Sequence, residues 1–197
     1  MGRQDPGGGH AAGGRKALCN QPAPPEWCEN PALKVNGCAA DLAAITTAGY
    51  ARLAREWKSG DTIELELPMQ ARRIQAHPSV RQDCGKIALQ RGPVVYCIEE
   101  CDNGKELADI LLPRSAAVQE EWLPELLGGT VALTATGLRR RRADWENALY
   151  QPLPVEPSPR AEYEPVALRA IPYALWDNRG KGEMRVWINE LNDRPRM

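Results

Sequence analysis

Residues 97–101, with the sequence CIEEC, carry the side chains best suited to metal chemistry, because Glu99 lies between the thiols of Cys97 and Cys101. Thiolates and carboxylates bind zinc, and a nearby cation turns a thiol into a nucleophile. A structural zinc site needs four ligands with compatible spacing, and no histidine lies close in sequence. We therefore interpret Cys97 as a core residue of a strand and Cys101 as the start of a turn. The sequence predicts no metal ligand and no catalytic residue.

A second candidate site is a loop with glycine on its C-terminal side, near the end of the chain. Sugars stack their apolar faces on Trp and Tyr rings, while planar polar groups beside the rings bind the hydroxyls. The candidate carbohydrate-binding residues are Tyr173, Trp176, Asn178 and Arg179. The alternative interpretation is structural: Tyr173 and Trp176 would then fill the core, and Asn178 and Arg179 would brace the loop.

Other common active-site patterns receive no support. Paired carboxylates can cleave glycosidic bonds, but the chain has 26 acidic residues and the sequence cannot nominate a pair among them. One of its two histidines, His77, precedes a proline and is expected in an extended turn. No glycine-rich segment follows a strand and opens a helix, which argues against a nucleotide-phosphate loop.

Composition narrows the classes of partner and compartment. The formal net charge of −1 argues against a nucleic-acid or anionic-membrane binder, which would normally be basic. The sequence has no apolar run long enough to span a membrane and no signal peptide at its start, so we expect a cytoplasmic protein. Six cysteines without a CxxC pair are interpreted as free thiols in a reducing compartment.

The segments that would position the candidate site residues have the sequence patterns of β-strands. Residues 61–67, DTIELEL, alternate strictly, and the alternation places Ile63, Leu65 and Leu67 on a buried face. Asn36-Gly37 is a strong hairpin signal. The segments that predict further strands are 33–35, 87–89, 94–98, 110–112, 130–136, 166–171 and 183–188. Short strands with frequent turns indicate an all-β protein. Only residues 120–127 suggest a helical turn, and the proline-rich residues 151–165 suggest an extended loop.

Three segments of the chain resemble one enzyme family. They are GYARLAREWKSGDTIELELPM at 49–69, GKIALQRGPVVYCIEECDN at 85–103 and AIPYALWDNRGKGEMRVW at 170–187. They resemble the region that follows the catalytic part of glycoside hydrolase family 127, the β-L-arabinofuranosidases. The resemblance implies two β-sandwich-like domains: an incomplete middle one at 26–98, expected to be the less stable, and a C-terminal one at 99–197. The glycine-rich residues 1–25 match nothing in the family and are expected to be disordered.

The resemblance also implies where the chemistry lies. Family members carry an (α/α) barrel with a cysteine nucleophile at a zinc ion, held by three cysteines and a glutamate. This chain has no adjacent cysteine pair, which the family motif contains. We therefore expect no cofactor on this chain, with zinc in the intact parent enzyme. The expected partners are the parent's catalytic barrel, a second copy of the chain, or arabinose-containing glycans. The alternatives are a standalone carbohydrate-binding or protein-interaction module.

Overall fold

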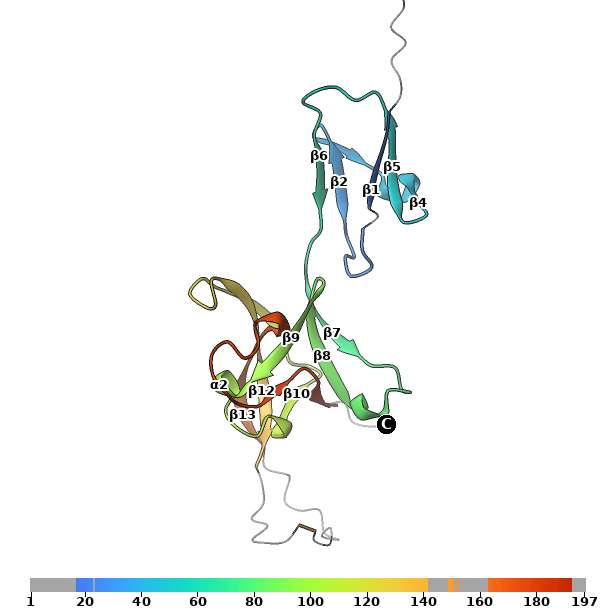
Figure 1. Ribbon diagram of the computed structural model, residues 1–197. Helices are drawn as coiled ribbons and strands as arrows, with labels where there is room; N and C mark the ends of the chain where they lie inside the picture. Colours follow the sequence, from blue (N-terminus) through green and yellow to red (C-terminus); the bar gives the residue numbers. More distant parts are fainter. Residues whose placement is uncertain (1–16, 23, 142–148, 151, 153–162, 193–197) are drawn as a thin grey trace, which may run out of the picture. The chain divides into compact units, whose positions relative to one another are not determined.

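The computed structural model describes residues 17–22, 24–141, 149–150, 152 and 163–192. The chain divides into two compact units, Met1–Pro68 and Met69–Met197. Within the described residues, strands form most of the regular structure and the helices are single short turns (Figure 1). The predicted all-β class is therefore confirmed. No helix among the described residues is long and apolar enough to cross a membrane.

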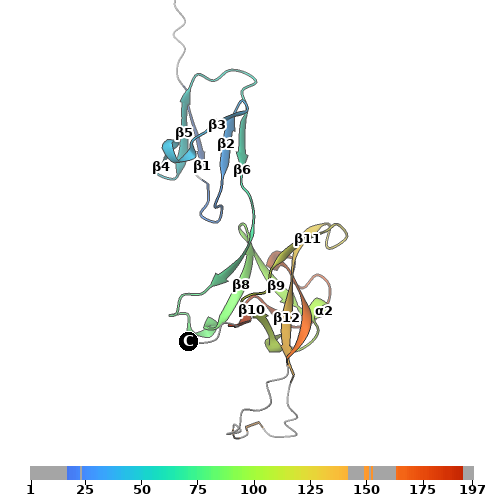
Figure 2. The same cartoon turned by 180° about the vertical axis from the view of Figure 1, so that it is seen from behind.

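The first unit is a small sandwich of two three-stranded antiparallel sheets, with strand orders β1-β5-β4 and β3-β2-β6. Leu33 and Val35 on one sheet pack against Leu53 on the other to form its core. Figure 2 shows β3, β2 and β6 side by side. The elements are β1 (Ala17–Pro22), β2 (Ala32–Val35), β3 (Cys38–Ala40), α1 (Leu42–Ile45), β4 (Thr46–Thr47), β5 (Tyr50–Arg55) and β6 (Ile63–Glu66).

Two features of this unit follow from its local sequence. Asn36 and Gly37 both have positive φ, 51° and 76°, as the predicted hairpin between β2 and β3 requires. The Asp41 side chain accepts hydrogen bonds from the backbone N–H groups of Ala43 and Ala44, at 3.0 and 3.3 Å, and so begins α1. The predicted strand at 61–67 is present as β6, but Leu65 is exposed because it lies on the edge strand of its sheet.

The second unit is a β-barrel. Its strand order is β14-β9-β13-β12-β10-β15-β8-β7, and an additional pairing of β8 with β9 closes the ring. The predicted β-sandwich would have two facing sheets here, whereas the structure has one sheet that closes on itself. Strands β7, β14 and β11 pair on the outside of the ring. The strands are β7 (Ala71–Gln75), β8 (Lys86–Arg91), β9 (Val94–Glu99), β10 (Ile110–Pro113), β11 (Gln119–Leu123), β12 (Thr130–Arg140), β13 (Tyr163–Pro172), β14 (Met184–Arg185) and β15 (Ile188–Leu191).

The inside of the barrel is a continuous apolar core. Among the buried residues of this core cluster, Tyr96 is the one aromatic residue. Its hydroxyl donates to the carbonyl of Val131 at 2.9 Å, and burial raises the pKa of this hydroxyl. Short helical turns between strands complete the unit: η1 (Arg81–Asp83), α2 (Glu100–Asn103), η2 (Leu107–Asp109) and η3 (Tyr173–Leu175). The buried residues are Ile87, Leu89, Tyr96, Ile98, Leu107, Ile110, Leu112, Leu133, Leu168, Ala170 and Ile188.

The division between the units lies thirty residues earlier than expected, at 68/69 instead of 98/99. The reason is pairing: β8 pairs with β15 and β9 pairs with β13, both of which follow residue 99. The expected domain boundary after residue 98 is therefore wrong, since it would cut the barrel within β9, one residue before the strand ends.

Three local expectations also need correction. Residues 17–22 were expected in the disordered tail, but they form β1 and pair with β5. Residues 1–16 lie outside the described residues. The helical turn expected at 120–127 is replaced by β11, whose backbone pairs with β12. The single strand expected at 183–188 is divided into β14 and the start of β15, which pair with different partners, β9 and β8. Most of residues 151–165 lie outside the described part.

We expect the first unit to be the less stable of the two. Among the described residues, its core cluster has three buried apolar residues, compared with eleven in that of the barrel. Each buried large apolar side chain contributes roughly 1.5–3 kcal/mol. Backbone amides of β2 and β5 should therefore exchange with deuterium well before those of β9 and β12. Equal protection of the two sets in the monomer would contradict this prediction.

Candidate functional site

The predicted carbohydrate-binding residues lie on η3 and the loop that follows it, directly after β13. Tyr173 and Trp176 are 46% and 40% exposed, so neither is a core residue. Their rings are stacked on each other, with centroids 6.0 Å apart and planes 12° from parallel. The structure therefore places an aromatic pair at the surface of the barrel unit.

Asn178 and Arg179 instead hold the loop in place. The Nδ2 of Asn178 donates to the carbonyls of Leu175 and Trp176, at 3.0 and 3.1 Å. Arg179 forms a fork with Asp102, from Nη1 to Oδ1 at 3.0 Å and from Nη2 to Oδ2 at 2.5 Å. The structural interpretation therefore describes Asn178 and Arg179, which brace the loop. It does not describe Tyr173 and Trp176, which are exposed and do not fill the core.

Arg179 also binds a second carboxylate, Oε2 of Glu99, at the end of β9. The other oxygen of Glu99 accepts from the backbone N–H of Asp177 at 3.1 Å. The side chains of Glu99 and Asp102 are only 5% and 10% exposed. The hydrogen bonds that Arg179 donates to Asp102 are the largest cause that raises the pKa of Arg179, so the guanidinium stays charged and offsets part of the negative charge of the buried carboxylates.

These carboxylates and Cys101 form a group with donor atoms within 4.8 Å of one another, which the described residues offer as a candidate metal site. Its residues do not fit the zinc site that the family resemblance implies. The group has three donors, and the guanidinium of Arg179 already occupies the space between its carboxylates. Burial raises the pKa of the Cys101 thiol and raises that of Cys97 to about 12, which keeps both protonated. Zinc binds the thiolate form.

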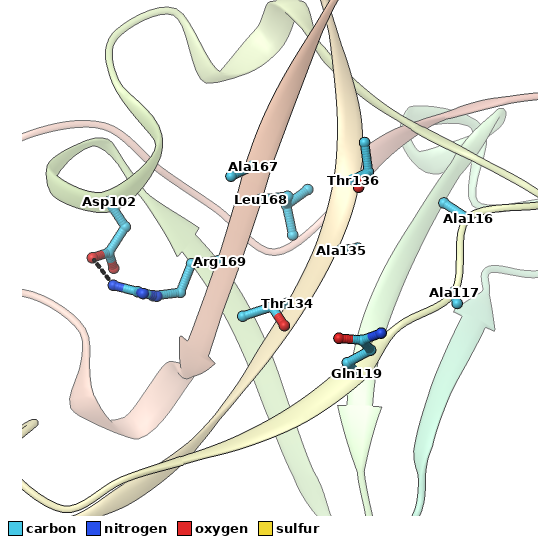
Figure 3. A pocket seen from close by; sticks show the side chains of 10 residues that line it. All are labelled: Asp102, Ala116, Ala117, Gln119, Thr134, Ala135, Thr136, Ala167, Leu168 and Arg169. Atoms are coloured by element: carbon cyan, nitrogen blue, oxygen red, sulfur yellow. Dashed lines mark ion pairs between the residues drawn. The ribbon is translucent and has the colours of Figure 1, made fainter.

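An open pocket of about 570 Å³ on the barrel unit was not predictable from the sequence (Figure 3). It lies over β12 and β13 and reaches the start of β11. The threonine and alanine residues of β12 can be read from the sequence, but the sequence does not show that β11 and β13 pair with β12. The lining residues are Asp102, Ala116, Ala117, Gln119, Thr134, Ala135, Thr136, Ala167, Leu168 and Arg169.

Two family models match consecutive parts of the chain. The β-L-arabinofuranosidase GH127 middle domain matches residues 23–69, and the glycoside hydrolase family 127 C-terminal domain matches residues 71–189. The two all-β units with this division therefore correspond to the middle and C-terminal domains of a family 127 glycoside hydrolase. The chain belongs to glycoside hydrolase family 127.

Individual relatives agree with this assignment. The chain is 42% identical over 138 residues to a non-reducing end β-L-arabinofuranosidase of Bifidobacterium longum subsp. longum, a match covering 66% of this chain and 20% of the relative. The crystal structure of a GH127 β-L-arabinofuranosidase from Geobacillus stearothermophilus T6 has a TM-score of 0.79 at 41% identity, covering 90% of this chain and 27% of that one. A structure titled glycoside hydrolase has a TM-score of 0.73 at 33% identity, covering 89% and 28%. The chain thus spans between 20% and 28% of the length of these relatives.

Proposed function

We propose that this chain is the accessory β region of an enzyme that hydrolyses non-reducing-end β-L-arabinofuranosides, and that it is not catalytic by itself. The observation that carries the proposal is an agreement between two independent boundaries. The compact units meet at Pro68 and Met69, and the two family domains meet between residues 69 and 71. The chain thus has the middle and C-terminal domains of the family as separate folding units.

In this proposal the units support the catalytic barrel of the parent enzyme and provide contacts between copies. The edge strand β6 favours such a role, because it leaves Leu65 exposed on an unpaired sheet edge. Exposed edges with apolar side chains are suited to pairing with another chain segment. Zinc belongs to the parent's catalytic part in this view, since Glu99 and Asp102 are already paired with Arg179. A cytoplasmic location is part of the proposal. The free thiols that suit a reducing compartment are those of Cys28, Cys38, Cys84, Cys97 and Cys101.

The alternative function is a standalone carbohydrate-binding or protein-interaction module. The exposed stacked pair of Tyr173 and Trp176 favours this alternative. In this alternative the pair would contact arabinose-containing glycans or a protein partner through its outer ring faces.

A chimera of the Geobacillus relative tests the accessory role. Its matching region is replaced by this chain, and the product is compared with the same enzyme truncated before that region. We expect the chimera to be soluble and to release arabinose from an aryl β-L-arabinofuranoside, and the truncated enzyme to be insoluble or inactive. A truncated enzyme as active as the intact one would show that the region is dispensable and would contradict the proposal.

The purified chain alone is expected to give no turnover of the same aryl arabinofuranoside above background, and to hold far less than one zinc ion per chain. The physical reason is that the only donor group among the described residues is paired with Arg179. Elemental analysis and a chromogenic assay measure the two quantities. Turnover that disappears in the Glu99→Gln variant, with the fold kept, would reveal a catalytic site on this chain.

A further inference from the structure

The pocket on the barrel is crossed by a row of polar side chains from three adjacent strands. Gln119 on β11 lies opposite Thr134 on β12, and Thr134 lies opposite Arg169 on β13. Directly opposed residues of antiparallel strands project on the same face, with Cβ atoms roughly 4.5–5.5 Å apart. The amide, hydroxyl and guanidinium groups all line the pocket; Figure 3 shows the three side chains on adjacent strands, with the guanidinium of Arg169 turned toward Asp102.

The hollow results from small residues beside this row. Thr136 on β12 lies opposite Ala167 on β13. Each is two positions from Thr134 or Arg169 on its own strand, and so lies on the same face of the sheet. Ala117 precedes Gln119 by two positions and also lines the pocket. Large side chains at these positions would fill the space. The volume of about 570 Å³ falls within the range of ligand sites for small molecules, about 300–1,000 Å³.

The polar groups of the row are available to a ligand. In the described part of the structure, the side chains of Gln119, Thr134 and Thr136 make no hydrogen bond to the protein. The Arg169 side chain is 44% exposed and reaches Asp102 only at 3.7 Å. Asp102 already has two shorter bonds from Arg179, so most N–H groups of Arg169 are left for other acceptors.

The charges around the pocket balance. Of the residues that line it, Asp102 contributes one negative charge and Arg169 one positive charge, and the adjacent ion pair of Glu99 and Arg179 adds one of each. An anionic ligand would leave this group with an excess of negative charge beside buried carboxylates, whereas a neutral ligand rich in hydroxyls would use both the donors and the acceptors of the row.

We propose that this pocket binds a neutral sugar residue of a glycan, through hydrogen bonds from Gln119, Thr134 and Arg169. The site is separate from the Tyr173–Trp176 pair, and it uses polar contacts where that pair offers stacking. It goes beyond the accessory role proposed above, because an accessory region needs no glycan site of its own. In the parent enzyme the pocket would hold a neighbouring part of a branched substrate outside the catalytic centre.

The test is a titration of the ¹⁵N-labelled full chain with methyl β-L-arabinofuranoside, followed by NMR. We expect saturable shifts of the Gln119 side-chain amide and of the Thr134 and Arg169 backbone amides, with a dissociation constant of about 1 mM. Thr134→Val removes one hydroxyl at constant shape and should weaken binding by about twofold to tenfold. Arg169→Gln should weaken it by about tenfold.

Matched variants control for general effects. Thr47→Val changes an exposed strand threonine of the first unit, and Arg140→Gln changes an exposed arginine at the end of β12. Neither should alter binding. Arg169→Gln should leave the fold intact, because Asp102 keeps both bonds from Arg179 and the backbone of residue 169 keeps its bonds to Asn103.

Each outcome decides the proposal. Absence of saturable shifts up to the solubility of the sugar overturns it, and so do shifts confined to Tyr173 and Trp176. Tighter binding of glucuronate than of the neutral glycoside overturns the neutral-ligand assignment. Binding by the chain together with an inactive chimera would uphold the pocket while the accessory role fails, so the two proposals are tested separately.

Discussion

Replacing Arg179 with leucine is expected to lower the free energy of unfolding of the barrel unit by about 3–5 kcal/mol. Arg179 is the shared partner of two carboxylates that are almost fully buried, Glu99 and Asp102. Removing the guanidinium leaves Glu99 without its cationic partner and Asp102 with only the 3.7 Å contact of Arg169, in a medium that solvates both carboxylates poorly. Urea unfolding followed by tryptophan fluorescence, with hydrogen exchange to assign the change to this unit, measures the loss.

Two further variants make this expectation specific. Arg114→Leu removes an arginine that binds Glu190 at 2.5 Å but is 49% exposed, and it should cost about 1 kcal/mol or less. Adding Glu99→Gln to Arg179→Leu should recover part of the loss, because one of the uncompensated charges is then removed. A loss in Arg179→Leu no larger than that in Arg114→Leu would show that the buried cluster is not the main support of its loop.

The strands of this protein were predictable where the signal is local. Alternation located β6, and the turn residues Asn36 and Gly37 located the β2–β3 hairpin, because each depends on neighbours in sequence. Gly92-Pro93 likewise marks the turn between β8 and β9. In contrast, β11 has almost no buried side chain, so no alternation marks it; its strand conformation comes from pairing with β12.

The closure of the barrel and the boundary between the units depend on distant pairing. β8 and β9 belong to the second unit because they pair with β15 and β13, which are encoded about a hundred and about seventy residues later. Nothing in residues 85–99 distinguishes a strand that ends one domain from a strand that begins the next. The family resemblance supplied the order of domains but not the position of their boundary.

The candidate site shows the same limit. Residue types in the loop 173–179 suggested an aromatic surface, and the exposed pair is present. The partners of Arg179 could not be inferred, since Glu99 and Asp102 lie 80 and 77 residues earlier. The polar row of the pocket joins three strands whose register is visible only in the folded sheet.

Asn103 is expected to contribute nearly as much stability as Arg179, although it is uncharged. Its buried side chain replaces a missing strand neighbour for residue 169: Nδ2 donates to the carbonyl of Arg169 at 2.8 Å, and Oδ1 accepts from the N–H of Arg169 at 2.9 Å. Nδ2 also donates to the carbonyl of Glu99 at 2.9 Å. One amide thus satisfies three backbone groups and ties α2 to β13.

Asn103→Ala should therefore lower the free energy of unfolding of the barrel unit by about 3 kcal/mol, since each buried backbone group left without a partner costs about 1–3 kcal/mol. The backbone amide of Arg169 should become one of the fastest to exchange on β13. Asn178→Ala is the matched control, because that side chain also donates two hydrogen bonds but is exposed, so water can take its place and the loss should be about 1 kcal/mol or less. Equal losses in the two variants would mean that the backbone of residue 169 finds other partners, and that α2 is held to the barrel by the Arg179 cluster alone.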